Sequence, residues 1–65
     1  MLKVGDNFCI KRNNNSFLPP AMEIERTFRV KEVCREPVTE KIYYKFSDGK
    51  TIWRVFHFDV IKMGI

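Results

Sequence analysis

The residues of this chain that could carry out catalysis are few, and they form no recognisable catalytic group. General acid–base catalysis requires side chains with adjusted pKa values that are held together in a pocket. The chain has one histidine, His57, beside an aromatic run, and no grouping of serine, histidine and acid matches a catalytic signature. Its three glycines are isolated, so the sequence contains no phosphate-binding loop. The sequence therefore predicts a protein that is not an enzyme and uses no cofactor.

A metal site would have to draw on a small number of ligands, which are Cys9, Cys34, His57 and Asp59. A structural metal site needs about four ligands, and the spacing of these residues matches neither C-x-x-C nor H-x-x-x-H. We therefore expect no metal site. Nothing resembles a signal peptide or a membrane span, so we expect a cytoplasmic protein with two reduced thiols and no contact with a membrane.

Basic residues interleaved with aromatic residues form one candidate binding site. The net charge is +4, from twelve lysines and arginines against eight acids. Cations that contact phosphates release counterions, and an aromatic or guanidinium plane can stack on a base. The candidate nucleic-acid contacts are Arg29, Lys31, Lys41, Tyr43, Lys45 and Arg54. A second interpretation stays open, in which these residues, with the acids near them, only keep the sheet surface soluble.

A predicted loop over residues 13–25 carries the other candidate site. The run from Asn13 to Ser16 favours turns, and Pro19-Pro20 excludes a central strand. Between them lie Phe17 and Leu18, which would contact a protein partner if they were exposed. The alternative is that they fold back and cover one end of a small hydrophobic core.

The remaining residues predict strands that would position both sites in a single domain over residues 1–65. Leu2, Val4, Phe8 and Ile10 share one parity and are expected to face inward. After the loop, Phe28 and Val30 alternate with basic residues, and the parity then slips, which indicates a bulge or bend near Glu32. The tail predicts one helical turn from His57 and then a short strand.

A hairpin is predicted where two runs rich in aromatic and β-branched residues flank Asp48-Gly49. A type I′ turn at these two residues would place Ser47 opposite Lys50. One face of the hairpin, expected in the core, would then pair Phe46 with Thr51, Tyr44 with Trp53 and Ile42 with Val55. The other face, expected at the surface, would pair Lys45 with Ile52 and Tyr43 with Arg54.

Three stretches resemble the SH3-like small barrels of the KOW and Tudor type. Val4-Gly5-Asp6-Asn7-Phe8-Cys9-Ile10 is similar to their opening strand, Phe46-Ser47-Asp48-Gly49-Lys50 to their distal hairpin, and Phe58-Asp59-Val60-Ile61 to their helical turn. The resemblance implies an all-β fold, a five-stranded SH3-like barrel with a long loop after the first strand. The acidic, aromatic loop motif of signalling SH3 domains is absent from the sequence. In size, the chain resembles small accessory proteins of bacteriophages or bacteria.

A small barrel without catalytic groups is expected to act by binding. The first expectation is a non-enzymatic accessory protein, monomer or homodimer, that docks on a protein partner through Phe17 and Leu18 of the 13–25 loop or through an open strand edge. The alternative is a nucleic-acid-binding barrel that uses the basic and aromatic strand face.

Overall fold

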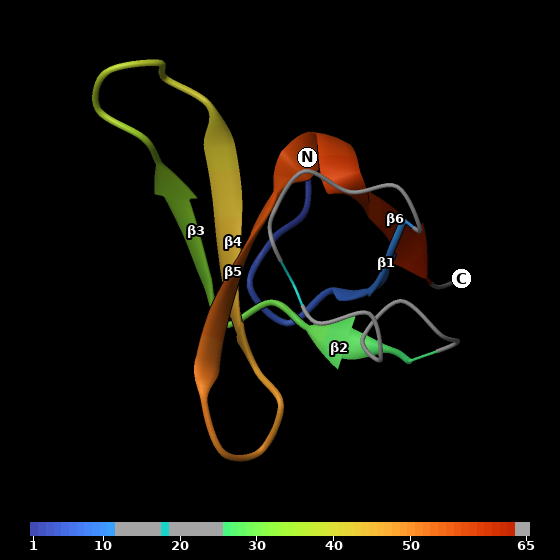
Figure 1. Cartoon of the computed structure of the whole chain (residues 1–65). Coiled ribbons are helices and arrows are strands. Elements are labelled where there is room, and N and C mark those ends of the chain that lie inside the picture. The colour runs from blue at the N-terminus through green and yellow to red at the C-terminus, as the bar shows by residue number, and fades with distance from the viewer. Residues whose placement is uncertain (12–17, 19–25, 64–65) are drawn as a thin grey trace.

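The computed structural model describes residues 1–11, 18 and 26–63, which form two small antiparallel sheets (Figure 1). The first sheet has the order β2 (Phe28–Arg29), β1 (Asn7–Ile10) and β6 (Val60–Met63). The second has the order β3 (Glu32–Arg35), β4 (Ile42–Ser47) and β5 (Ile52–Phe56). A single 3₁₀ turn, η2 (His57–Asp59), joins β5 to β6. Within the described ranges, no helix is long and apolar enough to cross a membrane.

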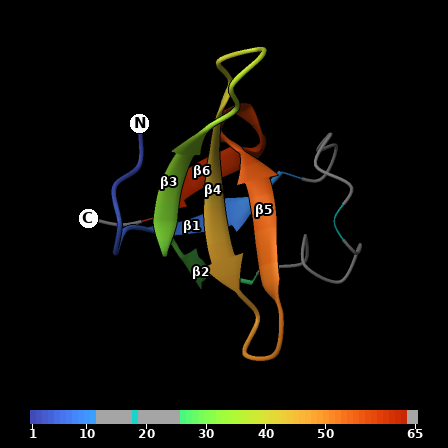
Figure 2. The same ribbon diagram turned by 90° about the vertical axis from the view of Figure 1, so that its left-hand side faces the viewer.

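The core lies between the two sheets, which Figure 2 shows one in front of the other. Three phenylalanine rings form its centre: the ring centroid of Phe46 lies 5.3 Å from that of Phe8 and 4.7 Å from that of Phe28. These rings come from three different strands of the two sheets. Among the described residues, the buried apolar ones are Leu2, Phe8, Ile10, Leu18, Phe28, Val30, Tyr44, Phe46 and Val55.

The predicted all-β fold is confirmed, while the number of strands differs from the prediction. The described residues form six strands instead of five, because the strand expected to begin at Phe28 is divided between the two sheets. The backbone N–H of Val30 still donates to Asp6, whereas that of Lys31 donates to Lys45 on β4. The bend expected near Glu32 lies between Val30 and Lys31, where the chain changes its hydrogen-bonding partner.

The alternation predicted for the first strand is confirmed for Leu2, Phe8 and Ile10, which are all buried. It is wrong for Val4, which is 65% exposed. The reason is the turn at this point, where Gly5 has a φ of 93° and the backbone N–H of Asp6 donates to the carbonyl of Lys3. Glycine adopts this conformation without steric cost, so the chain reverses before the regular alternation begins.

The hairpin forms with the predicted faces but in a register shifted by two residues. Phe46 pairs with Trp53, Tyr44 with Val55 and Tyr43 with Phe56. The prediction of a type I′ turn is wrong, because such a turn requires a positive φ at Asp48. Among the described residues, Glu40 is the one non-glycine residue with a positive φ, so Asp48 does not have one. Because side chains alternate with a period of two, a shift of two residues leaves every side chain on its predicted face.

Asp48 is the physical reason for the longer loop. Its Oδ1 accepts hydrogen bonds from the backbone N–H groups of Lys50 and Thr51, each at 2.8 Å. Its Oδ2 accepts one from Nε1 of Trp53 at 2.9 Å. Asp side chains commonly replace backbone partners in this way, and here the side chain organises a loop over residues 48–51.

Candidate functional site

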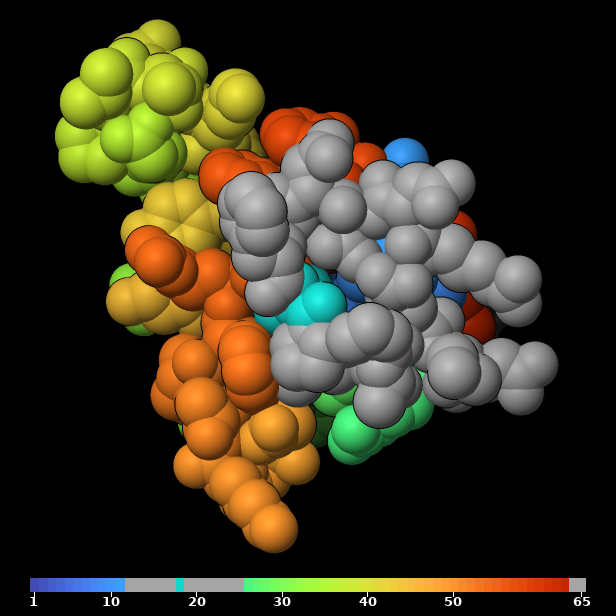
Figure 3. Space-filling view, viewed as in Figure 1, coloured from blue at the N-terminus to red at the C-terminus, as the bar shows by residue number. Residues whose placement is uncertain are grey.

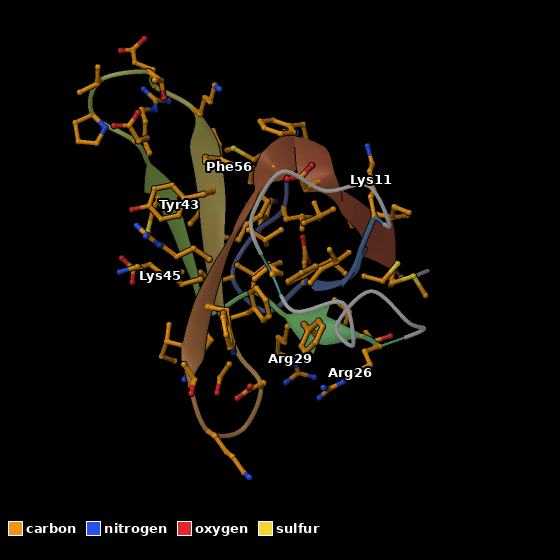
Figure 4. All side chains as sticks on the ribbon, viewed as in Figure 1. Lys11, Arg26, Arg29, Tyr43, Lys45 and Phe56 are labelled. Atoms are coloured by element: carbon orange, nitrogen blue, oxygen red, sulfur yellow. The ribbon has the colours of Figure 1, made fainter. Side chains whose placement is uncertain are left out.

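The β3–β4–β5 sheet has one face against the core and one face directed away from it, and the second is called the outer face here. Directly paired residues of antiparallel strands point to the same side. Tyr44, Phe46 and Val55 are buried, so the residues that alternate with them point outward. Figure 4 shows Tyr43 and Lys45 pointing away from the core. The outer face comprises Glu32, Cys34, Tyr43, Lys45, Ser47, Ile52, Arg54 and Phe56.

Aromatic rings gather at one end of the outer face. Tyr43 on β4 is the cross-strand partner of Phe56 on β5, and both are partly exposed. The ring of Phe58 on η2 stacks on that of Phe56, with centroids 5.3 Å apart and planes 6° from parallel. Phe58 is 44% exposed. The 3₁₀ turn thus adds a third aromatic ring beyond the end of β5.

Two cations lie over these rings. The Nζ atom of Lys41 is 5.9 Å from the ring centroid of Phe56 and 5.7 Å from that of Phe58. The guanidinium carbon of Arg54 is 5.8 Å from the ring centroid of Tyr43. All three distances are within the range over which a cation is attracted to an aromatic ring. The cations and rings therefore form one continuous surface, which we call the cation–aromatic cluster: Lys41, Tyr43, Arg54, Phe56 and Phe58.

A short loop over residues 36–41 positions Lys41 beside the rings of this cluster. It projects from the rest of the molecule in Figure 3. The carboxylate of Glu36 accepts hydrogen bonds from the Thr39 hydroxyl and from the backbone N–H groups of Thr39 and Val38. The hydroxyl bond, then the two backbone bonds, lower the pKa of Glu36 from its usual 4.5. The backbone N–H of Glu36 also donates to the carbonyl of Lys41 at 2.9 Å, which closes the loop.

Lys45 differs from Lys41 and Arg54 because, among the described residues, it forms an ion pair with a carboxylate. Its Nζ atom lies 3.7 Å from Oε2 of Glu32, the residue directly opposite on β3. The side chains are 38% and 61% exposed, respectively, so water screens the pair and its contribution to stability is small. The pair nevertheless reduces the positive charge that Lys45 presents to an anion.

The structure brings together four of the six residues that the sequence predicts as nucleic-acid contacts. Tyr43, Lys45 and Arg54 lie on the outer face, and Lys41 lies at its end. Arg29 does not share this surface, because β2 belongs to the other sheet, where Arg29 pairs with Asn7. Figure 4 shows it near Arg26, away from Tyr43 and Lys45. Lys31 is exposed at the point where the chain crosses between the sheets.

Phe56 and Phe58 are functional candidates that the sequence-based reasoning did not identify. Alternation along the strand placed Arg54 at the surface. Phe56 is two residues further on and has the same parity, so the same alternation could have indicated Phe56. The pairs named for the predicted register went no further than Ile42 with Val55, so Phe56 was not considered. The position of Phe58 depends on how η2 folds back on β5, and the local pattern carries no signal for that.

The structure describes only one of the two residues predicted to contact a protein partner, Phe17 and Leu18. Phe17 lies outside the described residues. Leu18 is 9% exposed and packs with the buried core. Its position agrees with the second interpretation of this pair, in which the loop covers the core.

The groups with catalytic or metal-binding chemistry are dispersed over the described residues. No cluster of three or more His, Cys, Asp or Glu side chains with metal-binding geometry occurs within residues 1–11, 18 and 26–63. Cys9 and Cys34 are free thiols on different sheets. The Sγ of Cys9 lies 3.6 Å from the Sδ of Met63 on the neighbouring strand.

Comparison of the chain with protein-family models, with curated proteins and with solved structures finds no match. The function is therefore inferred from the residues of the outer face and from their geometry.

Proposed function

We propose that this protein is a non-enzymatic binding module that binds single-stranded nucleic acid on the outer face of the β3–β4–β5 sheet. The observation that carries the proposal is the cation–aromatic cluster, in which Lys41 and Arg54 lie within 6 Å of exposed or partly exposed rings. Single-stranded nucleic acid offers both unstacked bases and phosphates. Proteins bind it by stacking bases on aromatic side chains while cations follow the backbone.

The distribution of charge supports the proposal. Three cations, Lys41, Lys45 and Arg54, lie on the outer face or at its end, with the acids Glu32 and Glu36 near them, and the whole chain has a net charge of +4. Lys41 and Arg54 form no ion pair with a carboxylate of the described residues, so phosphates do not have to displace one. An anionic ligand is therefore favoured over a cationic or neutral one.

We also infer that the two sheets are the halves of an SH3-like barrel. In support, β2 and β3 are separated by two residues and hydrogen-bond to β1 and β4 respectively. Counted as one bent strand, they give the five-strand order that the resemblance implies. Such a barrel leaves the outer face of one sheet open to a ligand, as the proposed function requires.

Docking on a protein partner is the second candidate function. Because Leu18 is buried, it is better explained as a core residue than as a contact for a partner. The observation that supports docking is instead the edge strand β6. On β6, which is at the edge of its sheet, Ile61 is 50% exposed and Met63 is 42% exposed. An extended segment of a partner could pair with such an edge and cover these side chains.

The proposed function is tested by fluorescence anisotropy with a labelled single-stranded oligonucleotide of about 12 nucleotides, a length that exceeds the smallest barrel sites. Two variants are compared: Lys41→Met, in the cluster, and Lys50→Met, an exposed lysine of the loop over residues 48–51. Both remove one charge. We expect Lys41→Met alone to lower the slope of log affinity against log salt by about one unit.

Amide chemical shifts identify the binding surface in the same titration. We expect the largest shifts at Lys41, Tyr43, Arg54 and Phe58, with recovery as the salt concentration rises. Unchanged spectra at millimolar oligonucleotide would exclude the proposed function. Shifts confined to β6 on addition of a protein partner would instead support docking.

A further inference from the structure

Three charged residues cross the outer face in a single row, one on each strand. Glu32, Lys45 and Arg54 are directly paired from β3 through β4 to β5. Neighbouring strands lie about 4.8 Å apart, so the row spans about 10 Å from the acid to the arginine. The row thus has a cationic end at Arg54 on β5 and an acidic end at Glu32 on β3.

The charge of Lys45, the middle residue of the row, is partly neutralised by Glu32. Lys45 is within 3.7 Å of the Glu32 carboxylate, whereas Arg54 lies over the ring of Tyr43. The Glu32 side chain is 61% exposed, so its carboxylate also faces any ligand that extends over β3. A phosphate placed there would meet a like charge at short range, which costs binding energy.

Duplex and single-stranded nucleic acid would interact differently with the part of the outer face near Glu32. A duplex carries two phosphate backbones, with one charge per about 1.7 Å of its axis, and its bases are stacked and paired. It cannot offer unstacked bases to the aromatic rings, and its two backbones spread charge across the whole face. A single strand can keep its phosphates beside Arg54 and Lys41 and turn its bases toward Tyr43 and Phe58.

We propose that Glu32 is a specificity-determining residue that makes the outer face select single-stranded over duplex nucleic acid. The inference rests on the proposed function and deepens it. Glu32 acts in two ways: its carboxylate repels phosphates that approach β3, and it neutralises Lys45, which would otherwise attract them. Repulsion of the wrong ligand is a common source of specificity in binding surfaces.

The test measures the affinity of the full chain for a single-stranded oligonucleotide and for a hairpin duplex of the same composition. Three proteins are compared: wild type, Glu32→Gln and Asn7→Lys. Asn7 is exposed on the other sheet, so Asn7→Lys raises the net charge by the same one unit away from the outer face. Glu32 is exposed and Gln is of similar size, so we expect the fold to persist, which the amide spectrum checks.

We expect Glu32→Gln to raise the affinity for the duplex by about tenfold and that for the single strand by less than about threefold. Asn7→Lys is expected to raise both affinities by the same small factor. Adding Lys45→Met to Glu32→Gln should remove part of the gain, because the freed Lys45 is one of its two sources.

Equal gains for the two ligands in Glu32→Gln, or equal effects of Glu32→Gln and Asn7→Lys, would overturn the role of Glu32 and leave the proposed function standing. Failure of all three proteins to bind the single strand would overturn both. A wild-type protein that prefers the duplex would also overturn the inference.

Discussion

The hydroxyl of Tyr44 lies 2.6 Å from Nδ1 of His57, and it also accepts a hydrogen bond from the backbone N–H of Leu2 at 3.0 Å. Because that N–H can only donate, the hydrogen of the hydroxyl is free to point at Nδ1. The buried Tyr44 side chain thus joins the N-terminal segment and the exposed His57 of η2 to β4. It also fixes the 3₁₀ turn from which Phe58 reaches Phe56.

Removing the hydroxyl should therefore destabilise the fold. Tyr44→Phe leaves the buried N–H of Leu2 without its acceptor, and an unsatisfied buried group costs about 1–3 kcal/mol. Tyr43→Phe, a matched change on the outer face, should alter the free energy of unfolding by less than about 0.5 kcal/mol. Urea denaturation of both variants measures the difference. Equal effects would show that the buried hydroxyl contributes no more than a surface one.

Phe58→Leu should weaken binding of single-stranded nucleic acid while the fold persists. The ring of Phe58 is 44% exposed, and stacking of one base on an aromatic ring contributes about 1–3 kcal/mol. We expect an affinity loss of about 5- to 150-fold in anisotropy titrations, with little change in the salt slope. Ile61→Ala, an exposed apolar residue on β6, is the control and should leave the affinity unchanged. A change in the salt slope instead of the affinity would argue against base stacking.

The stability of the hairpin should fall in acid because of Asp48. Hydrogen bonds from the backbone N–H of Thr51, from Trp53 and from the backbone N–H of Lys50 lower the pKa of Asp48 from 3.8 to about 2. A group with a lowered folded-state pKa contributes stability above the unfolded value, and that contribution is lost as the pH falls. The melting temperature should therefore decline between about pH 4 and about pH 2.

Asp48→Asn is the variant that tests this assignment. It removes the titrating carboxylate, so its melting temperature should fall less steeply over the same pH interval than that of the wild type. Glu40→Gln removes an exposed carboxylate from the 36–41 loop and should retain the wild-type slope. If Asp48→Asn kept the full acid dependence, the decline would have to come from other groups.

Glu40 is a position where glycine should stabilise the protein. Its φ is 60°, in the left-handed region, which costs a non-glycine residue about 1–2 kcal/mol. Glu40→Gly relieves that strain but increases the entropy of the unfolded chain, so we expect a net gain of about 0.5 kcal/mol. Glu40→Ala keeps the strain and should show no gain in guanidinium denaturation. A loss of stability in the glycine variant would contradict the expectation.

Gly49→Ala should have the opposite effect for a related reason. Gly49 has a φ of 100°, and a Cβ added there would meet no atom within 4 Å. Any cost must therefore come from the backbone conformation and not from a steric clash with neighbours. We expect a loss of more than about 1 kcal/mol by chemical denaturation. An unchanged stability would mean that the loop over residues 48–51 adopts another conformation without cost.

The sequence by itself determined the local features of the fold. Alternation placed Phe46, Tyr44 and Val55 in the core and Lys45 and Arg54 at the surface, and the structure confirms it. The 3₁₀ turn at His57 and the strand after it were also predicted. These properties depend on periodicity and turn chemistry over a few residues, and they survive even a register shift of two.

Only the tertiary structure decided which residues meet. The side chain of Asp48 set the register that pairs Tyr43 with Phe56, and the exchange of partners between Val30 and Lys31 moved Arg29 to the other sheet. The packing of η2 on β5 brought Phe58 beside Lys41. Each of these contacts joins segments through hydrogen bonds or packing that the alternation of a single strand does not encode, so the outer face became visible only once the sheets were assembled.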